Sequence, residues 1–435
     1  MAPEVRTVAN LKPYRQALAL PGLRPLLLVS VLARIPFTAT SLALTFYVLL
    51  ELERGYGAAG LVGAAMTVGA ALGAPLLGRL VDRYGLRPVL ALTTVTEAVF
   101  WSTAAFLPYP VLVGAAFLGG LLNLPLFSVI RQSIAAIAPP DHRRPAYALD
   151  SMSVELSFMI GPALAVALAT SFSPHLTLYA VGAGIVGSGI ILFLLNPPTR
   201  GNDEPAGPVR PPSRRTWLTP RLLGVLAVSA ACTLVLGGTD VSVVAALRDG
   251  GEVGWTGLVL TIWAVASLVG GFAYGALTRP VPPLMLLAGL SLTTIPIGLG
   301  GGNWWLLCLA LVPAGLLCAP TIAATADTVS RLAPAGARGE AMGLHGSAIT
   351  VGVALGAPLA GAVIDRTAAG WGFAVTGLIG LLVALAVLPA ELHRRRAATE
   401  HAAAERAVPD RTAGDHRKQS PTPNDPPGDL VGIER

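Results

Sequence analysis

Long apolar runs, separated by short stretches rich in proline, glycine and charged residues, make up most of the sequence. Each run is about as long as the roughly 20 helical residues that cross the hydrocarbon layer of a membrane. We therefore predict twelve membrane-spanning helices, six in each half of the chain. They are 25–50, 58–80, 88–107, 110–136, 146–170 and 176–195 in the first half, and 221–246, 255–277, 282–300, 304–328, 340–364 and 371–390 in the second.

The amino-acid composition favours a membrane protein built from helices. Hydrophobic residues make up 53% of the chain and charged residues 12%, whereas soluble domains carry roughly 25% charged residues. Only helices and closed barrels satisfy their backbone hydrogen bonds in lipid, and these runs are too long for barrel strands. The predicted fold class is an all-α membrane protein.

Three polar segments flank the predicted spans and divide the chain into domains. Residues 1–24 lack the short apolar core of a cleavable signal peptide, so we expect none. Residues 196–220 are rich in proline and arginine, as solvated linkers are, and connect six-helix bundles at 25–195 and 221–390. Residues 391–435 form a polar, proline-rich tail that we expect to be disordered.

The distribution of arginine predicts the orientation in the membrane. The linker and the connections after the second, fourth, eighth and tenth spans carry most of the arginines, and those on the other side have acidic neighbours. Cytoplasmic loops carry an excess of Lys and Arg. We therefore expect a multi-pass protein of the cytoplasmic membrane with both termini in the cytoplasm.

The two halves of the sequence resemble each other. Gly161–Ala165 reads Gly-Pro-Ala-Leu-Ala in the predicted fifth span, and Gly356–Ala360 reads Gly-Ala-Pro-Leu-Ala in the eleventh, 195 residues later. Internal repeats of this size occur in transporters, which bind substrate where the repeats meet near the middle of the membrane. We predict two pseudo-symmetric six-helix bundles.

A short motif follows the second predicted span. The stretch 78–87 reads Gly-Arg-Leu-Val-Asp-Arg-Tyr-Gly-Leu-Arg, and it resembles the loop 2–3 motif of the major facilitator superfamily at Gly78, Asp82, Arg83, Gly85 and Arg87. Leu86 and Pro88 depart from the more basic ending of the family motif. The resemblance implies a twelve-helix transporter in which these five residues form a cytoplasmic gate between the halves. The alternative is that Arg83 and Arg87 only set the topology.

A second, partial resemblance concerns Gly161 and Pro162. They are similar to the helix-kinking Gly-Pro pair of the antiporter branch of that family, which favours efflux over uptake. Drug–proton antiporters of the family also carry an arginine early in the fourth span, and here Ala115 and Ala116 stand in its place. Their coupling mechanism therefore does not transfer to this chain.

Three ionisable residues lie at similar depth inside predicted spans. Arg34, Glu97 and Glu155 are each about ten residues into spans one, three and five, which all enter from the cytoplasmic side. A charge at the bilayer centre costs roughly 2.5–3.5 kcal/mol, so such residues are paired or functional. We expect Arg34 to be neutralised by Glu155, Glu97 or both, either for proton or substrate coupling or as a static ion pair.

Further polar residues are candidates for the substrate cavity or for coupling: Asn123 beside a bend predicted at Pro125, Asp240 near the outer end of span seven, and His345 at the repeat-equivalent position of Asp150. Arg131, low in the fourth span, has Asp150 and Glu155 as possible partners. His345 is either a proton relay or a hydrogen-bonded packing residue, and Asp240 is either in the outer vestibule or at the interface.

These features together predict a secondary transporter that exports a small organic molecule in exchange for protons. The alternatives are proton-coupled uptake of a sugar, amino acid or other metabolite, and a receptor or scaffold that transports nothing. The sequence shows no metal-ligand cluster, nucleophile elbow or P-loop, so we expect no enzyme activity, cofactor or metal. The expected partners are a small-molecule substrate, protons and the lipid bilayer, without nucleic acid, and the expected state is a monomer.

Overall fold

The computed structural model describes residues 11–201, 212–277 and 280–407, with side chains described as far as His393. All regular secondary structure in these ranges is helical, and twelve helical segments are long and apolar enough to cross a membrane. The prediction of an all-α protein with twelve spans is therefore confirmed.

The first half contains α2 (Leu23–Phe46, extended by a π-helical turn at Tyr47–Glu51), α3 (Tyr56–Tyr84), α4 (Leu86–Thr103), the pair α5 (Tyr109–Leu121) and α6 (Leu126–Ile137), α7 (Pro140–Ser171) and α8 (Pro174–Leu195). The second half contains α10 (Pro220–Asp249), α11 (Thr256–Ala276), α12 (Pro283–Thr294, extended by a 3₁₀ turn at Ile295–Gly300), α13 (Trp304–Leu332), α14 (Arg338–Ile364) and α15 (Ala369–Ala407). Two short helices lie outside the spans, α1 (Lys12–Ala19) and α9 (Arg214–Trp217).

The fifth span begins earlier than the pattern of apolar residues predicts. Helix α7 starts at Pro140 and not at residue 146. Proline is favoured in the first helical turn, because its missing N–H would have no partner there, and Asp141 in that turn complements the helix dipole. The charged residues before 146 therefore belong to the helix and not to a loop.

The fourth span is broken, as the bend predicted near Pro125 suggested. Helix α5 ends at Leu121, α6 begins at Leu126, and the residues between them are not helical. Proline cannot donate a backbone hydrogen bond, so the helix cannot run through Pro125 with its ladder intact.

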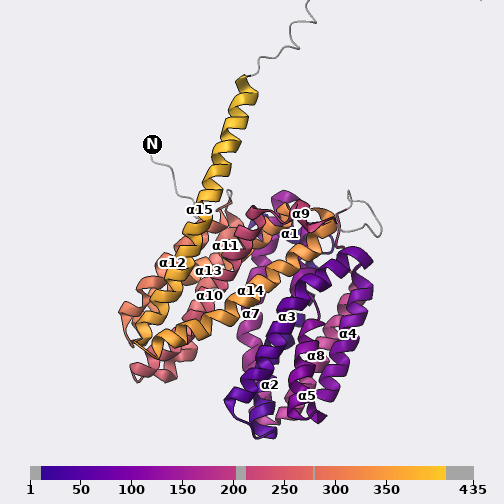
Figure 1. Cartoon of the computed structure of the whole chain (residues 1–435), viewed down its shortest axis with the longest axis vertical. Coiled ribbons are helices and arrows are strands. Elements are labelled where there is room, and N and C mark those ends of the chain that lie inside the picture. Colours follow the sequence, from indigo (N-terminus) through magenta and orange to yellow (C-terminus); the bar gives the residue numbers. More distant parts are fainter. Residues whose placement is uncertain (1–10, 202–211, 278–279, 408–435) are drawn as a thin grey trace, which may run out of the picture. The chain divides into compact units, whose positions relative to one another are not determined.

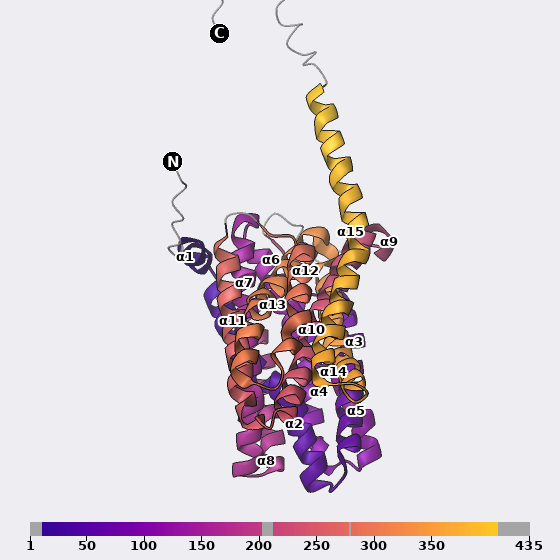
Figure 2. The ribbon, with the colours of Figure 1, turned by 90° about the vertical axis from the view of Figure 1, so that its left-hand side faces the viewer.

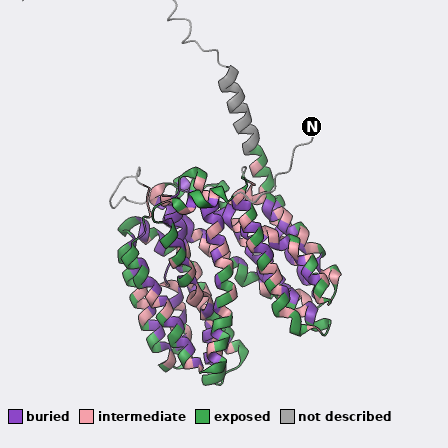
Figure 3. Cartoon of the chain, turned by 180° about the vertical axis from the view of Figure 1, so that it is seen from behind, coloured by how far each residue is buried: buried purple, intermediate pink, exposed green. Residues whose placement is uncertain are grey.

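Corresponding helices pair in the same way in both halves. Helix α2 packs along α7 and α3 along α5, while α10 packs along α14 and α11 along α13. Glycines permit the close approach: a Cβ at Gly73 would lie 2.0 Å from the carbonyl oxygen of Leu121, and one at Gly356 would lie 2.3 Å from that of Leu234. Buried residues gather where helices meet, and exposed ones line their outer sides (Figure 3).

The two halves meet at one end of the bundle, which we call the linker face. It is formed by α1, α9 and the α3–α4, α6–α7 and α13–α14 connections, and α1 lies there beside α11 (Figure 2). The main contacts between the halves join α3 to α14 and α7 to α11 and α13. Hydrogen bonds between the halves in the described residues reach no farther than mid-helix, and the halves diverge toward the opposite face (Figure 1).

Contacts divide the chain into a compact unit that ends at Val387 and a second unit from Leu388 onward. The twelve spans fall in or begin in the first unit.

Candidate functional site

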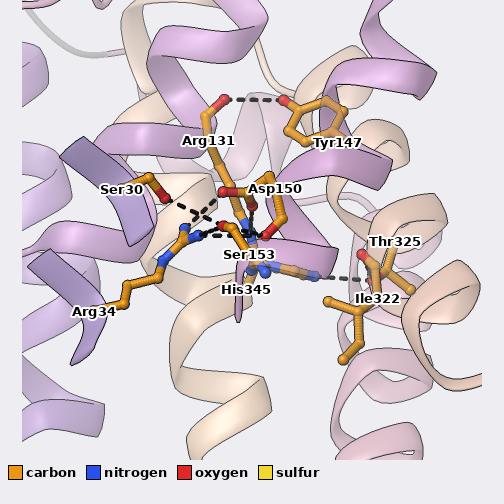
Figure 4. Close-up of polar contacts among 9 residues, drawn as sticks. All are labelled: Ser30, Arg34, Arg131, Tyr147, Asp150, Ser153, Ile322, Thr325 and His345. Atoms are coloured by element: carbon orange, nitrogen blue, oxygen red, sulfur yellow. Dashed lines mark hydrogen bonds and ion pairs between the residues drawn. The ribbon is translucent and has the colours of Figure 1, made fainter. Parts of the chain in front are cut away.

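A cluster of polar side chains is buried between the two halves on the linker-face side of the bundle (Figure 4). We call it the central network, and all of its members are buried: Ser30, Arg34, Arg131, Tyr147, Asp150, Ser153, Thr325 and His345. They come from α2, α6, α7, α13 and α14. A buried polar group costs free energy unless it is hydrogen-bonded, so the contacts within this network decide whether it is stable.

Arg34 of α2 is fully buried and points toward α7. Its Nη2 atom lies 2.7 Å from Oδ1 of Asp150, and its Nη1 donates to the Ser153 hydroxyl at 2.7 Å. The guanidinium also lies over the ring of Phe127, 4.7 Å from the centroid, where a cation–π attraction adds to the ion pair.

The prediction that Glu155 or Glu97 neutralises Arg34 is wrong, because Asp150 is the partner. Asp150 and Glu155 are five residues apart, and at 3.6 residues per turn their side chains point about 140° apart around α7. The sequence indicates how deep each residue of α7 lies in the membrane, but it does not indicate which side of α7 faces Arg34. Asp150, considered only as a partner of Arg131, holds both arginines.

Arg131 joins the two halves. Its Nε donates to Oδ2 of Asp150 at 3.2 Å, and its Nη1 lies 3.1 Å from Nδ1 of His345 on α14. The hydroxyl of Thr325 donates to the carbonyl oxygen of Ile322 at 2.9 Å, and its oxygen lies 3.0 Å from Nε2 of His345. Arginine can only donate, so Nδ1 must accept and His345 is neutral with its proton on Nε2.

The central network contains more positive than negative charge. Arg34 interacts favourably with Asp150 and unfavourably with Arg131, and the neutral ring of His345 adds no negative charge. Since arginine keeps its proton in proteins, the two guanidinium groups share a single carboxylate. Within the network, two positive charges are therefore balanced by one negative charge.

Glu155 makes a different contact between the halves. Its Oε1 accepts a hydrogen bond from the hydroxyl of Ser267 on α11 at 2.9 Å, and the same Ser267 oxygen accepts from the backbone N–H of Ala319 at 3.2 Å. No cation of the described residues forms an ion pair with Glu155. Asp240 of α10 is exposed and close enough for its charge to interact with that of Glu155.

Glu97 and Asn123 lie within the first half. Glu97 is buried and accepts a hydrogen bond at 2.7 Å from Nε1 of Trp101, one turn along the same helix. Asn123 is partly buried in the break between α5 and α6, and its role in substrate contact stays a prediction.

At the linker face, Asp82 binds the first turn of α14. Its two carboxylate oxygens accept the backbone N–H groups of Gly339 and Glu340, each at 2.9 Å, and Gln132 donates to Oδ1 at 3.0 Å. A Cβ at Gly78 would lie 2.1 Å from the Gly339 carbonyl oxygen. Gly78 and Asp82 therefore hold the end of α3 against the first turn of α14, and their role as a gate stays a prediction.

The other three motif residues lie away from this contact. Arg83 is exposed and stacks on Tyr84, with 5.0 Å to the ring centroid, and Arg87 is exposed and lies 5.6 Å from the centroid of Phe193. Gly85 ends α3 with a φ of +84°, which glycine adopts without steric cost. Their part in a gate stays a prediction.

Two linker arginines that sequence reasoning missed contact the residues that join α3 to α14. Arg200 donates to the backbone carbonyl of Asp82 at 2.7 Å, and Arg214 of α9 pairs with Glu340. Their location in a proline-rich, charged stretch gave no sign of a specific contact, because solvated linkers have the same composition.

Helix α1 forms a further contact at the linker face. Tyr14 stacks on Phe272 of α11, with 4.8 Å between the ring centroids, and its hydroxyl donates to the Phe272 carbonyl oxygen. Burial raises the pKa of Tyr14 to about 12. The hydroxyl therefore keeps its proton throughout the physiological pH range.

Gly161 and Pro162 lie inside α7, which remains helical through both. A Cβ at Gly161 would lie 2.0 Å from Oγ1 of Thr38 and 2.5 Å from the carbonyl oxygen of Ile35. The glycine thus permits α2 and α7 to touch. The helix-kinking role expected of the pair stays a prediction.

The part of the chain that the structure describes contains no group of three or more His, Cys, Asp or Glu residues placed to hold a metal ion. The three cysteines are free and buried: Cys232, Cys308 and Cys318. The chemistry available at the interface between the halves is therefore that of carboxylates, guanidinium groups, one imidazole and hydroxyls.

Comparisons with known proteins agree with this architecture. The model of the Major Facilitator Superfamily matches residues 26–280 and 243–422. A relative in Sinorhizobium fredii, the uncharacterized MFS-type transporter y4rN, is 26% identical over 395 residues, which cover 86% of this chain and 96% of the relative.

Two solved structures share the fold at low sequence identity. A bacterial homologue of the iron transporter ferroportin, in its outward-facing state, has a TM-score of 0.69 at 17% identity. The human organic anion transporter MFSD10 has a TM-score of 0.66 at 18% identity. Each match covers 84% of this chain and 99% of the other.

Proposed function

The chain belongs to the Major Facilitator Superfamily of membrane transporters, and we propose that it exports a small organic solute in exchange for protons. On this proposal the two six-helix halves alternate between states that open to opposite sides of the cytoplasmic membrane. The excess of arginine near the linker face supports a cytoplasmic location for that face. The conformation described above is then closed toward the cytoplasm.

The contact between Glu155 and Ser267 carries the proposal of proton coupling. A carboxyl group in a membrane interior without a cation beside it takes up a proton readily, because the neutral form avoids the cost of a buried charge. Glu155 lies on α7 and its partner on α11, so motion of the halves changes its surroundings. Uptake and release of a proton by Glu155 would thereby follow the conformational cycle.

The proposed direction of transport depends on Gly161 and Pro162. Their resemblance to the Gly-Pro pair of antiporters favours export, and the close packing of Gly161 against α2 supports a structural demand for glycine there. Coupled uptake would use the same carboxylate with the solute moving in the opposite direction.

A flux experiment tests the proposal. Purified full-length protein is first screened by thermal shift against a library of small organic molecules, and each compound that stabilises it is followed in proteoliposomes under an imposed pH gradient. Flux opposite to that of protons supports export, flux with protons indicates uptake, and no flux of any such compound indicates a receptor.

Paired variants test the residue assignment. Glu155→Gln should retain solute binding and solute exchange but lose acceleration by the pH gradient. Glu97→Gln is the matched control, because Glu97 is hydrogen-bonded to Trp101 of its own helix within the first half. Unchanged pH dependence in Glu155→Gln would reject its proton role.

A further inference from the structure

The central network has an excess positive charge at a place where the two halves meet. We propose that Arg131 binds the anionic group of the transported solute when the linker face opens. This assigns the substrate to small organic anions such as carboxylates, and it presupposes the transport function proposed above while adding a substrate class to it.

The first argument is the balance of charge. Arg34 and Arg131 share Asp150, whose two oxygens lie 2.7 Å from Nη2 of Arg34 and 3.2 Å from Nε of Arg131. Glu97 and Glu155 make their side-chain hydrogen bonds elsewhere, with Trp101 and Ser267. An anion entering the network would neutralise the remaining charge, whereas a cation would be repelled by it.

The second argument is the position of the two arginines relative to the moving parts. Arg34 has Asp150, Ser153 and Phe127 around it, all within the first half. Arg131 instead makes one of its contacts with His345 of the second half. When the halves separate at the linker face, Arg34 keeps its partners and Arg131 loses one.

The third argument is the chemistry of His345 in the closed conformation. The bonds from His345 to Thr325 and from Thr325 to Ile322 direct the lone pair of Nδ1 at the Arg131 guanidinium. His345 thus supplies a neutral acceptor in the closed state. Opening removes this acceptor and leaves the Nη1 edge of Arg131 free for a carboxylate, which matches the planar guanidinium and can bind it through two oxygens.

The arrangement explains why the acceptor is neutral. A carboxylate in place of His345 would bind Arg131 permanently and compete with the solute. A neutral imidazole satisfies the guanidinium in the closed state, because buried donors need a partner, yet yields to a charged ligand, since charge-assisted hydrogen bonds are the stronger ones.

The test uses matched ligands that differ in charge. Purified full-length protein in nanodiscs is titrated, at constant ionic strength, with acetate, benzoate, 2-naphthoate, succinate and benzenesulfonate, each beside its neutral amide, and with benzylamine as a cation. The proposal expects thermal stabilisation by at least one anion and none by its amide. It is overturned if no anion of this set stabilises the protein, or if amides and benzylamine do so equally.

Three variants decide whether Arg131 is responsible. Arg131→Gln should weaken the apparent affinity for the preferred anion at least tenfold, whereas Asp150→Asn and His345→Ala should strengthen it, the first by adding positive charge and the second by removing the competing acceptor. The control is Arg54→Gln, an arginine that stacks on Tyr109 in the first half, far from the linker face; it should leave anion binding unchanged.

If Arg131 recognises the anion, affinity should fall in Arg131→Gln and rise in the other two variants. If the network is only structural, anion affinity should fall in all three variants. If Arg131→Gln does not fold, Asp150→Asn and His345→Ala still test the proposal. The proposal is overturned if neither of these two variants binds the anion more tightly than the parent protein does. Proton-driven flux of a neutral or cationic solute would reject the anion class and leave the coupling proposal standing. Exchange of a carboxylate at a rate that does not depend on pH would reject the coupling proposal and support the anion class.

Discussion

Replacing Asp82 by Asn should shift the protein from the conformation closed at the linker face toward the one open there. Asp82 belongs to the first half, and the two N–H groups that it accepts, from Gly339 and Glu340, belong to the second. Opening of the linker face must break both hydrogen bonds. The substitution keeps the size of the side chain, removes its charge and replaces one acceptor oxygen by an amide donor.

The expected size of the effect follows from these contacts. A hydrogen bond to a charged group contributes about 1.5–3 kcal/mol. Asparagine retains one acceptor oxygen for one of the two N–H groups at 2.9 Å, and its amide nitrogen faces the other donor. Together with loss of the favourable charge at the start of α14, about 0.3–1 kcal/mol, the closed state should lose roughly 2–4 kcal/mol. That is a shift of roughly 30- to 900-fold in the ratio of closed to open protein.

Spin labels on either side of the contact between Asp82 and α14 measure this ratio. Cysteines at Arg83 and Pro334 place one exposed label on each half beside the contact, and the native cysteines, Cys232, Cys308 and Cys318, are buried. Pulsed electron resonance should show a longer distance gaining population in Asp82→Asn.

Asp141→Asn provides the control, because Asp141 is an exposed carboxylate in the first turn of α7. It should leave the distances as they are. A folded Asp82→Asn protein whose distance distribution equals that of the parent would refute the reasoning that this contact holds the linker face closed.

Two further substitutions test the packing of the bundle. Gly161→Ala should destabilise the protein by about 1–3 kcal/mol, as overpacking does, because the new Cβ would overlap Thr38. Gly187→Ala is the control, since a Cβ there meets nothing within 4 Å and should not lower stability. Equal melting temperatures of the two variants would contradict this prediction. Tyr14→Phe should loosen α1 from Phe272, seen as faster hydrogen exchange in α1. Since burial raises the pKa of Tyr14 to about 12, its contribution is complete below pH 10 and lost only as pH rises toward 12, so an effect that varied between pH 6 and 9 would argue against this contact.

The fold could be predicted from the sequence because lipid constrains it strongly. Every backbone group must be paired within its own helix in the membrane, so apolar length alone indicates each span, and Pro125 marked the break in the fourth. The start of α7 was misplaced, since polar residues such as Asp141 extend a helix beyond the hydrocarbon without an apolar signal.

The site was predictable only in part. Arg34, Glu97 and Glu155 were placed at similar depth, because depth depends on counting residues along each span. Which carboxylate meets Arg34 depends on helix rotation, and a rotation of about 140° separates Asp150 from Glu155. The sequence of one helix does not show which of its faces contacts the neighbouring helix.

The ion pair between Arg34 and Asp150 also has a consequence for synthesis of the protein. Asp150 lies 116 residues after Arg34, so at 5–20 residues per second the first span waits roughly 6–23 seconds for its partner. During that time α2 carries an unpaired charge that costs roughly 2.5–3.5 kcal/mol in the membrane. The first span to leave the ribosome is therefore neutralised only when the fifth span arrives, and chains that stop before α7 should be poorly retained in the bilayer.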